Sequence, residues 1–492
     1  MTLDTMLLIG SVVLLVAVLA ARLGSRFGLP SLLLFLAVGS VMGLLGFGLD
    51  DAGFAHALGF AALVFILGEG GLATRWSDIR GALSVAGLLA TVGVGVSIGA
   101  TAAFGYLLLG LSLPTALLLG AIMSPTDSAA VFSVLRNVPL PARIRSVLEG
   151  ESGLNDAPIV LMVSAGTAWA MGELPEGGPA ALGGLIVVEL VGGLLLGAVV
   201  GYLGSRMLQG VALPASGLYP LATVGVIVLS YGVGVAIHVS GFAAVYVCAL
   251  VLGNSSLPHR QATRSFAEGV GWVSQIGLFV MLGMVVDFNR ITPFVVLEGL
   301  LLGAFVTFVA RPLSVLLCSI GSGFTLRQQA FVSWAGLRGA VPIIMATVPL
   351  AAGAPEARLI FDAVFVFVVV FTLLQAPTLP LVAGWLRVSL GAQPVDIEVE
   401  VAPLDKIQAD FMQVKVPLGS KLHGVTVKEM RLPKLAVIAV IIREGEPRTP
   451  SEWERIQEGD ELLIVVPSRR RREVEERFRA VGRGGRLARW WE

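Results

Sequence analysis

The chain has 492 residues, of which 55% are hydrophobic and only 14% are charged, whereas about a quarter of the residues in a soluble protein are charged. Its mean hydropathy is +0.86, and its apolar stretches approach the roughly 20 residues that a helix needs to cross a bilayer. This composition excludes a soluble enzyme, a disordered chain and a nucleic-acid binder, and it predicts an all-α polytopic membrane protein. The net charge is zero, but the first lysine is Lys406. We therefore expect the C-terminal end to form a separate soluble module.

Apolar runs bounded by charged residues, Gly or Pro predict about thirteen transmembrane helices. Arginines such as Arg75, Arg143 and Arg260 follow odd-numbered spans, so the positive-inside rule places the N-terminus outside and the C-terminal domain in the cytoplasm. We expect a multi-pass protein of the cell inner (plasma) membrane. The first span lacks a basic start and is interpreted as a membrane helix, not a signal peptide. The predicted spans are 5–24, 29–48, 52–73, 82–109, 113–134, 145–170, 180–208, 216–236, 239–254, 268–286, 292–319, 328–352 and 359–386.

The C-terminal module follows a change in composition after Arg387. Alternating or apolar runs at 411–417, 435–442 and 461–466 are typical of strands. We therefore expect a small cytoplasmic α+β domain. The predicted division of the chain is a membrane domain at 1–390, a linker at 391–407, a regulatory domain at 408–480 and a C-terminal tail at 481–492.

Ionisable groups inside a bilayer are costly unless they are paired or hydrated, so each one is a candidate functional residue. Several of the predicted spans carry such groups. Three acids lie near span ends, and there we expect them to reach water: Glu149, Glu298 and Asp362. Glu189 lies in the seventh span, and its sequence context predicts no function.

The densest polar stretch in any span is GESGLNDAP at 150–158. On a helix, Ser152 and Asp156 share one face and Glu151 and Asn155 share the neighbouring face. Pro158 cannot donate a hydrogen bond to the preceding turn, which leaves a carbonyl oxygen beside the carboxylates. Oxygen ligands alone suit hard cations such as sodium or potassium. The alternative interpretation is a polar helix packed inside a bundle.

Two spans are interrupted by proline among small polar residues. SPTDS at 124–128 contains Pro125 and Asp127, and GLRGAVP at 336–342 contains Arg338 and Pro342. Such interruptions favour local unwinding, which membranes tolerate only where the backbone lines a cavity or is buried in protein. The two spans run in opposite directions, and paired broken helices in inverted repeats indicate a binding site near the midplane of a secondary transporter.

These motifs resemble those of the monovalent cation:proton antiporters of the NhaP and sodium/proton-exchanger branch. The resemblance rests on SPTDSAAV at 124–131, LEGESGLNDAPIV at 148–160, ARPLSV at 310–315 and GLRGAVP at 336–342. It implies a thirteen-helix homodimer, built from inverted repeats, with a dimerisation domain and a core domain around two crossed broken helices. It also implies potassium or sodium ions and protons as substrates.

The resemblance implies a role for individual residues as well. Asp156 would be the carboxylate that binds both cation and proton, with Asp127 as a second exchange carboxylate. The other residues implied in cation binding are Thr126, Ser152, Asn155 and Glu69. Glu151 would form a structural ion pair with Arg311, and Arg338 is the alternative partner for Glu151.

The C-terminal module resembles the RCK-C (TrkA-C) domains of potassium-transport regulators. The resemblance extends from Phe411 to Val466 and is most specific at the turn Gly459-Asp460. It implies potassium in place of sodium as the cation, regulation by this domain, and a cytosolic nucleotide as its ligand. The basic run Arg469–Arg472 is expected to be a solvated helix face, with contact to anionic membrane lipid or a nucleotide as the alternative.

Cation:proton exchange follows if a buried carboxylate must be neutralised by one ligand or the other before it can move through apolar surroundings. Two other functions remain as alternatives. A potassium efflux pathway gated by the C-terminal domain would need a filter of backbone carbonyls, and the sequence has no such run. A larger pocket lined with aromatic residues would favour the second alternative, a proton-coupled transporter of organic solutes. We expect no enzyme activity, no cofactor and no transition metal.

Overall fold

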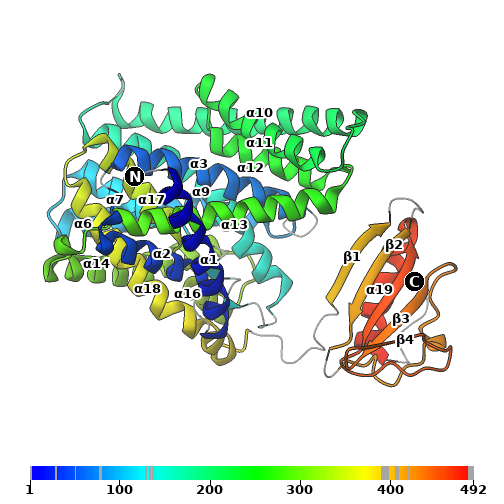
Figure 1. Cartoon of the computed structure of the whole chain (residues 1–492). Coiled ribbons are helices and arrows are strands. Elements are labelled where there is room, and N and C mark those ends of the chain that lie inside the picture. The colour runs from blue at the N-terminus through cyan, green and yellow to red at the C-terminus, as the bar shows by residue number, and fades with distance from the viewer. Residues whose placement is uncertain are drawn as a thin grey trace. The chain divides into compact units, whose positions relative to one another are not determined.

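The computed structural model describes residues 3–27, 30–49, 51–76, 80–127, 130–131, 134–135, 138, 140–174, 176–388, 398–404, 409–417 and 420–485. The chain divides into two compact units, Met1–Ser389 and Leu390–Glu492. The first unit is helical and the second is built on a β-sheet (Figure 1). A polytopic helical protein with a small α+β domain is therefore confirmed as the fold class.

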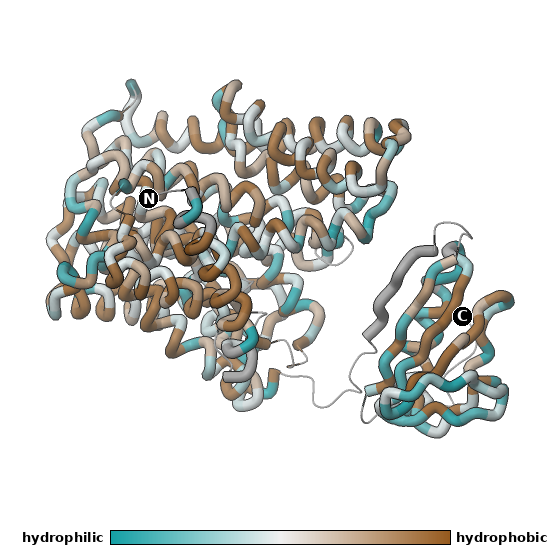
Figure 2. Tube along the Cα trace, in the orientation of Figure 1, coloured by the Kyte–Doolittle hydropathy of each residue, from teal (hydrophilic) through white to brown (hydrophobic). Residues whose placement is uncertain are grey.

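Helices occupy each of the predicted spans in the first unit. Among the described residues, seven are long and apolar enough to cross a membrane, and shorter apolar helices lie between them. Figure 2 shows hydrophobic residues, coloured brown, along the length of these helices. The helices are α1 (Leu3–Phe27), α2 (Ser31–Met42), α3 (Ala52–Ala73), α5 (Leu83–Leu88), α6 (Val94–Leu108), α7 (Leu113–Met123), α9 (Ala142–Ala170), α10 (Gly178–Gly210), α11 (Leu218–Ala236), α12 (Gly241–Asn254), α13 (Arg260–Val285), α14 (Pro293–Phe305), α15 (Arg311–Cys318), α16 (Leu326–Trp334), α17 (Ala340–Ala352) and α18 (Ala357–Trp385).

One group of helices packs through small residues. Helix α12 contacts α10, α11 and α3, and α13 contacts α2 and α3; Figure 1 shows α10, α11 and α12 side by side. Gly193, Gly197 and Gly201 repeat every fourth residue along α10, and a Cβ at Gly197 would lie 2.4 Å from the Ala244 carbonyl oxygen of α12. Backbones approach this closely only where glycine leaves room, as is common between membrane helices.

A second group is built around helices that stop inside the unit. Helix α7 ends at Met123, and α16 and α17 are separated by residues 335–339. Pro342 lies in the first turn of α17, where its missing N–H leaves no hydrogen bond unmade. Helices α9 and α6 pack against α7, while α18 packs against α14 and α17.

The structure corrects the expectation that Asp362 reaches water. Asp362 on α18 is 6% exposed and forms an ion pair with Arg290, at 3.5 Å. Arg290 ends the 3-10 turn Phe288–Arg290 between α13 and α14. It lies so far from Asp362 along the chain that the sequence does not indicate their contact. Because burying an unpaired carboxylate is costly, the arginine accounts for the position of the acid.

The second unit contains one antiparallel sheet with the strand order β1-β2-β5-β3-β4 and the helix α19 (Arg471–Gly484). The strands are β1 (Glu398–Leu404), β2 (Ala409–Lys415), β3 (Val437–Arg443), β4 (Glu446–Arg448) and β5 (Glu461–Pro467). Alternate residues of β2 and β5, such as Met412 and Ile464, join Phe478 of α19 in a buried core. The predicted linker at 391–407 differs from the structure, because β1 pairs with β2 along its whole length.

An ion pair stabilises one end of this sheet. Arg443, the last residue of β3, donates from Nε and Nη2 to the two carboxylate oxygens of Asp460, each at 2.9 Å. Asp460 is fully buried and also accepts the Gln457 N–H at 2.7 Å. The hydrogen bonds that Arg443 donates to Asp460 raise the pKa of Arg443 above its already high ordinary value. The Gly-Asp turn is therefore held by a bidentate charged pair.

Candidate functional site

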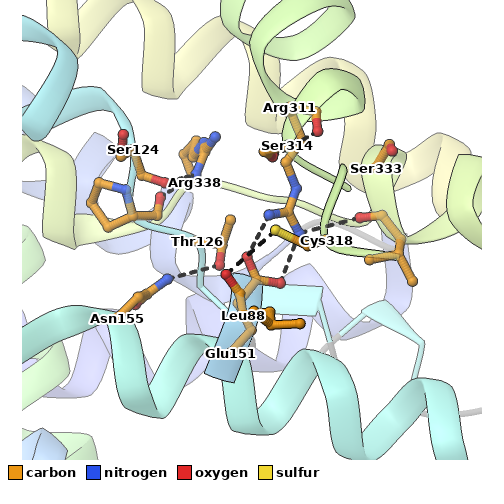
Figure 3. Close-up of polar contacts among 12 residues, drawn as sticks. Leu88, Ser124, Thr126, Glu151, Asn155, Arg311, Ser314, Cys318, Ser333 and Arg338 are labelled. Atoms are coloured by element: carbon orange, nitrogen blue, oxygen red, sulfur yellow. Dashed lines mark hydrogen bonds and ion pairs between the residues drawn. The ribbon is translucent and has the colours of Figure 1, made fainter. Parts of the chain in front are cut away.

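The two interruptions predicted from proline meet each other in the structure. The Asp127 N–H, just after α7, donates to the Leu337 carbonyl oxygen between α16 and α17 at 2.8 Å. Arg338 lies in the same interruption and is 3% exposed. Its Nη1 donates to the carbonyl oxygens of Ser124 and Pro125, as Figure 3 shows. The guanidinium therefore lies at the C-terminal end of α7, where orphan carbonyls carry partial negative charge.

Asp127 lies against the start of the other broken helix, α17. A Cβ at Gly339 would lie 1.7 Å from Asp127 Oδ2, so the carboxylate lies directly against the backbone that caps the N-terminus of α17. Oδ1 also accepts the Ala130 N–H at 3.2 Å. A negative charge is favourable near a helix N-terminus. Each interruption thus supplies the charge that the end of the other broken helix requires.

Helix α18 supports the second interruption from outside. Thr372 Oγ1 donates to the Arg338 carbonyl oxygen at 2.8 Å, and Gln375 Nε2 donates to the Trp334 carbonyl oxygen at 3.2 Å. Both donors are buried. These bonds replace helical hydrogen bonds that the break removes, which is the condition for irregular backbone at membrane depth.

Helix α9 brings Glu151 to Arg311 of α15. Arg311 Nη2 donates to Glu151 Oε2 at 2.8 Å, and Nη1 donates to Oε1 (Figure 3). Glu151 is 2% and Arg311 4% exposed. Arg311 also donates to the Val332 carbonyl oxygen of α16, at 3.4 Å. A bidentate pair of this kind is held by geometry as well as by charge, and it links three helices.

One turn further along α9, Asn155 and Asp156 have fewer partners. Asn155 is fully buried, and its Nδ2 donates to Thr126 Oγ1 at 3.2 Å (Figure 3). Its Oδ1 and Asp156 Oδ1 are buried without any hydrogen-bond partner. Ser152 is also buried on this stretch of α9. Since buried oxygens almost always have a donor, these two oxygens are candidates to bind a ligand that supplies positive charge or a proton.

Glu69 lies in a different place from the other predicted residues. It lines a small pocket between α3, α11 and α13, together with Phe65, Leu72, Val224, Ile227 and Ala267. None of these residues belongs to α9 or to either interruption. The structure therefore brings together Thr126, Asp127, Asn155 and Asp156, while Glu69 borders its own pocket.

Tyr246 is a neighbour of the site that the sequence reasoning missed. This residue of α12 is 6% exposed, and a Cβ at Gly153 would lie 2.5 Å from its hydroxyl oxygen. The charges of Asp156 and Glu149 also act on this hydroxyl. The signal in the sequence is Gly153 itself, because an interior glycine costs a helix about 1 kcal/mol and indicates that another group approaches closely.

Comparisons with known proteins place both units of the chain in known families. The family model described as "Sodium/hydrogen exchanger, transmembrane" matches residues 12–385, and the TrkA-C domain model matches residues 411–479. The K(+)/H(+) antiporter NhaP of Alkalimonas amylolytica is 35% identical over 454 residues, covering 90% of this chain and 77% of that protein. The K(+)/H(+) antiporter NhaP2 of Shewanella oneidensis is 33% identical over 474 residues, covering 94% and 81%.

A solved structure shows the same fold. The sodium proton antiporter MjNhaP1 from Methanocaldococcus jannaschii superposes with a TM-score of 0.70 at 21% identity, covering 78% of this chain and 99% of that one. Both resemblances inferred from the sequence motifs are thereby confirmed. The chain belongs to the sodium/hydrogen exchanger family and is a multi-pass cation:proton antiporter with a C-terminal TrkA-C domain.

Proposed function

We propose that the protein exchanges potassium ions for protons and that Asp156 is the carboxylate shared by the two ligands. The observation that carries this proposal is that Oδ1 of Asp156 is buried without a hydrogen-bond partner, as is Oδ1 of the preceding Asn155. Oxygen ligands suit a hard monovalent cation, and a carboxylate oxygen can bind a proton in the same place. The two ligands therefore compete for one position.

Competition gives coupling because an ionised carboxylate is costly to carry through apolar surroundings. Asn155 is uncharged, so Asp156 supplies one negative charge that one proton or one monovalent cation neutralises. Asp127 and Arg338 face helix ends of opposite polarity, which leaves the charge of Asp156 as the variable one. This favours exchange of one proton for one cation, with Thr126 and Ser152 as neighbouring oxygen donors.

Potassium is favoured over sodium by the relatives. Two proteins that match at least 90% of this chain are named K(+)/H(+) antiporters, and similarities of this length reach into the TrkA-C region. We further propose a homodimer in the cell inner membrane, with the second unit in the cytoplasm. In this proposal a small cytosolic ligand, such as a nucleotide, regulates exchange by binding two conformations with different affinity.

The proposal is tested in everted membrane vesicles with a dye whose fluorescence is quenched by a pH gradient. Adding potassium should dequench the dye at a lower concentration than adding sodium or lithium. Asp156→Asn vesicles give the background for leak. Equal half-maximal concentrations for potassium and sodium would overturn the potassium assignment but leave antiport intact. Absence of dequenching with any of the three cations would overturn exchange itself.

Regulation is tested by ending the chain after Val388, before strand β1 begins. The truncated and full-length proteins should both dequench the dye, with different dependence on pH and potassium concentration. Superimposable curves, with and without a nucleotide extract, would show that the second unit does not regulate exchange.

A further inference from the structure

Three helix ends are tied together on one side of the membrane unit. Asn254, the last residue of α12, accepts the Trp76 N–H at 2.9 Å and donates to the Thr74 carbonyl oxygen at 3.0 Å, just after α3. Arg260, the first residue of α13, donates to the Gly253 carbonyl oxygen of α12. A Cβ at Gly253 would lie 2.5 Å from the Leu72 carbonyl oxygen. The ends of α3 and α12 and the start of α13 therefore form a fixed framework.

Arginines gather on this framework. Arg75 follows α3, and Arg260 and Arg264 occupy the first two turns of α13. The positive charges of Arg260 and Arg75 both act on Arg264. The N-terminus of a helix as long as α13 adds partial positive charge at the same end. Like charges brought together in this way are unfavourable unless an anion is present.

Arg264 carries the inference. Its side chain is half-buried, and its Nε and Nη2 atoms are buried without any hydrogen-bond partner. Among the ion pairs between described residues, none involves Arg264. Glu268, one turn further along α13, is exposed to solvent. Leaving the hydrogen bonds of a buried charged group unmade costs free energy. These two nitrogens therefore indicate an acceptor that binds from outside the chain.

We propose that Arg264, together with Arg75 and Arg260, binds a phosphate group at the junction of α3, α12 and α13. A guanidinium with two free N–H donors matches the paired oxygens of a phosphate better than it matches a chloride ion. Trp76, beside Arg75, is 49% exposed, and exposed tryptophans are typical of the membrane–water interface. The phosphate of an anionic lipid is therefore the first source to test, and soluble phosphate is the second.

Binding is measured on the purified full-length protein in neutral detergent, independently of exchange. Native mass spectrometry counts retained phosphatidylglycerol, with monoolein as a lipid that has no phosphate. A thermal-unfolding titration with inorganic phosphate, against chloride at equal ionic strength, tests the soluble source. Arg264→Gln removes the charge and keeps a similar length. Arg206→Gln on α10 is the matched control, because Arg206 lies over the ring of Tyr202 and outside the junction.

Wild type and Arg206→Gln should retain phosphatidylglycerol in preference to monoolein, and Arg264→Gln should weaken this binding at least about tenfold, as expected for loss of charge-assisted hydrogen bonds. Arg75→Gln should weaken it less, and it replaces Arg264→Gln if that variant does not fold. A phosphate-dependent shift without lipid retention would assign the site to soluble phosphate. Equal binding by wild type and both junction variants, equal retention of monoolein, or no binding of either phosphate source would overturn the proposal.

Discussion

Glu151 and Asp156 lie five residues apart on α9, yet the structure treats the two acids in opposite ways. Both oxygens of Glu151 accept hydrogen bonds from Arg311, whereas Oδ1 of Asp156 is buried and has no donor. The same helix thus holds one carboxylate that is paired with an arginine and one that has a buried oxygen without a donor. Intramembrane acids are costly in general, but only the second kind can report a change in proton or cation concentration.

The contrast suggests how one helix serves two purposes. The bidentate pair fixes α9 to α15 and α16, and this holds the next turn at a constant distance from Thr126. A matched acid therefore positions an unmatched one. Neutralising Asp156 should therefore reduce exchange and leave the stability of the protein unchanged. Neutralising Glu151 should first reduce stability.

The largest effect on exchange is expected from Asp156→Asn. The amide mimics the protonated carboxylate permanently, so cation-driven proton movement should fall below about a tenth of wild type, since several kcal/mol separate the charged and neutral forms in a membrane. Dye dequenching in vesicles measures this, with immunoblots to show that protein level is unchanged. Glu173→Gln, at an exposed position between α9 and α10, is the matched control. Retained exchange in Asp156→Asn would rule out the shared site.

The pair Glu151 and Arg311 should behave as a unit in stability. Removing one partner of a buried pair costs about 3–5 kcal/mol, whereas removing both can be nearly neutral. Glu151→Gln and Arg311→Gln should each lower the yield and melting temperature of the purified protein, and the double variant should recover much of the loss. A double variant no more stable than the worse single variant would show that the pair is not the main source of stability here.

A smaller effect is expected from Asp127→Asn. The carboxylate faces the N-terminus of α17, where a negative charge contributes about 0.3–2 kcal/mol. Exchange should therefore slow by up to about thirtyfold, and measurable activity should remain. Initial rates at saturating potassium provide the measurement. A loss as complete as that of Asp156→Asn would instead place Asp127 among the direct ligands of the exchanged ion.

The smallest effect is expected at Tyr246, which contacts α9 from α12. Tyr246→Phe keeps the ring against Gly153 and removes the hydroxyl near Asp156. A single hydrogen-bonding group is worth about 0.5–1.5 kcal/mol, so the half-maximal potassium concentration or the pH midpoint should shift by a few-fold. Tyr231→Phe, whose ring packs against Phe242, is the control. Identical profiles for both variants would make Tyr246 a packing residue.

Much of this arrangement could be predicted from the sequence, because each local signal has a local physical cause. Proline and glycine among polar residues predicted the interruptions near Pro125 and Arg338, and helical spacing placed Glu151 and Asn155 on one face. The resemblance to antiporters named Arg311 as the partner of Glu151. Many span boundaries lie within a few residues of the helix ends, but α13 begins at Arg260, eight residues before the predicted span 268–286, because a helix can continue through charged residues beyond its apolar part.

Other features depend on contacts between distant parts of the chain. No local pattern shows that Arg338 donates to the carbonyl oxygens that end α7, more than two hundred positions earlier, or that Arg290 covers Asp362. The resemblance predicts Glu69 as a cation ligand, and the pocket that Glu69 lines between α3, α11 and α13 is not visible in any local pattern. Strand β1 lies in the predicted linker. Its own residues do not identify it as a strand, because it forms by pairing with β2.

The interruption between α16 and α17 also has a mechanical consequence. Residues 336–339 leave the helical pattern and would ordinarily make a pliable joint. Here the Leu337 carbonyl oxygen accepts a hydrogen bond from the Asp127 N–H, and the Arg338 carbonyl oxygen accepts one from Thr372. The Arg338 guanidinium also donates to a carbonyl oxygen at the end of α7. Bending at this point would break bonds to two other helical segments at once. Force applied to either half is therefore transmitted to α7 and α18, and the interruption is braced against bending.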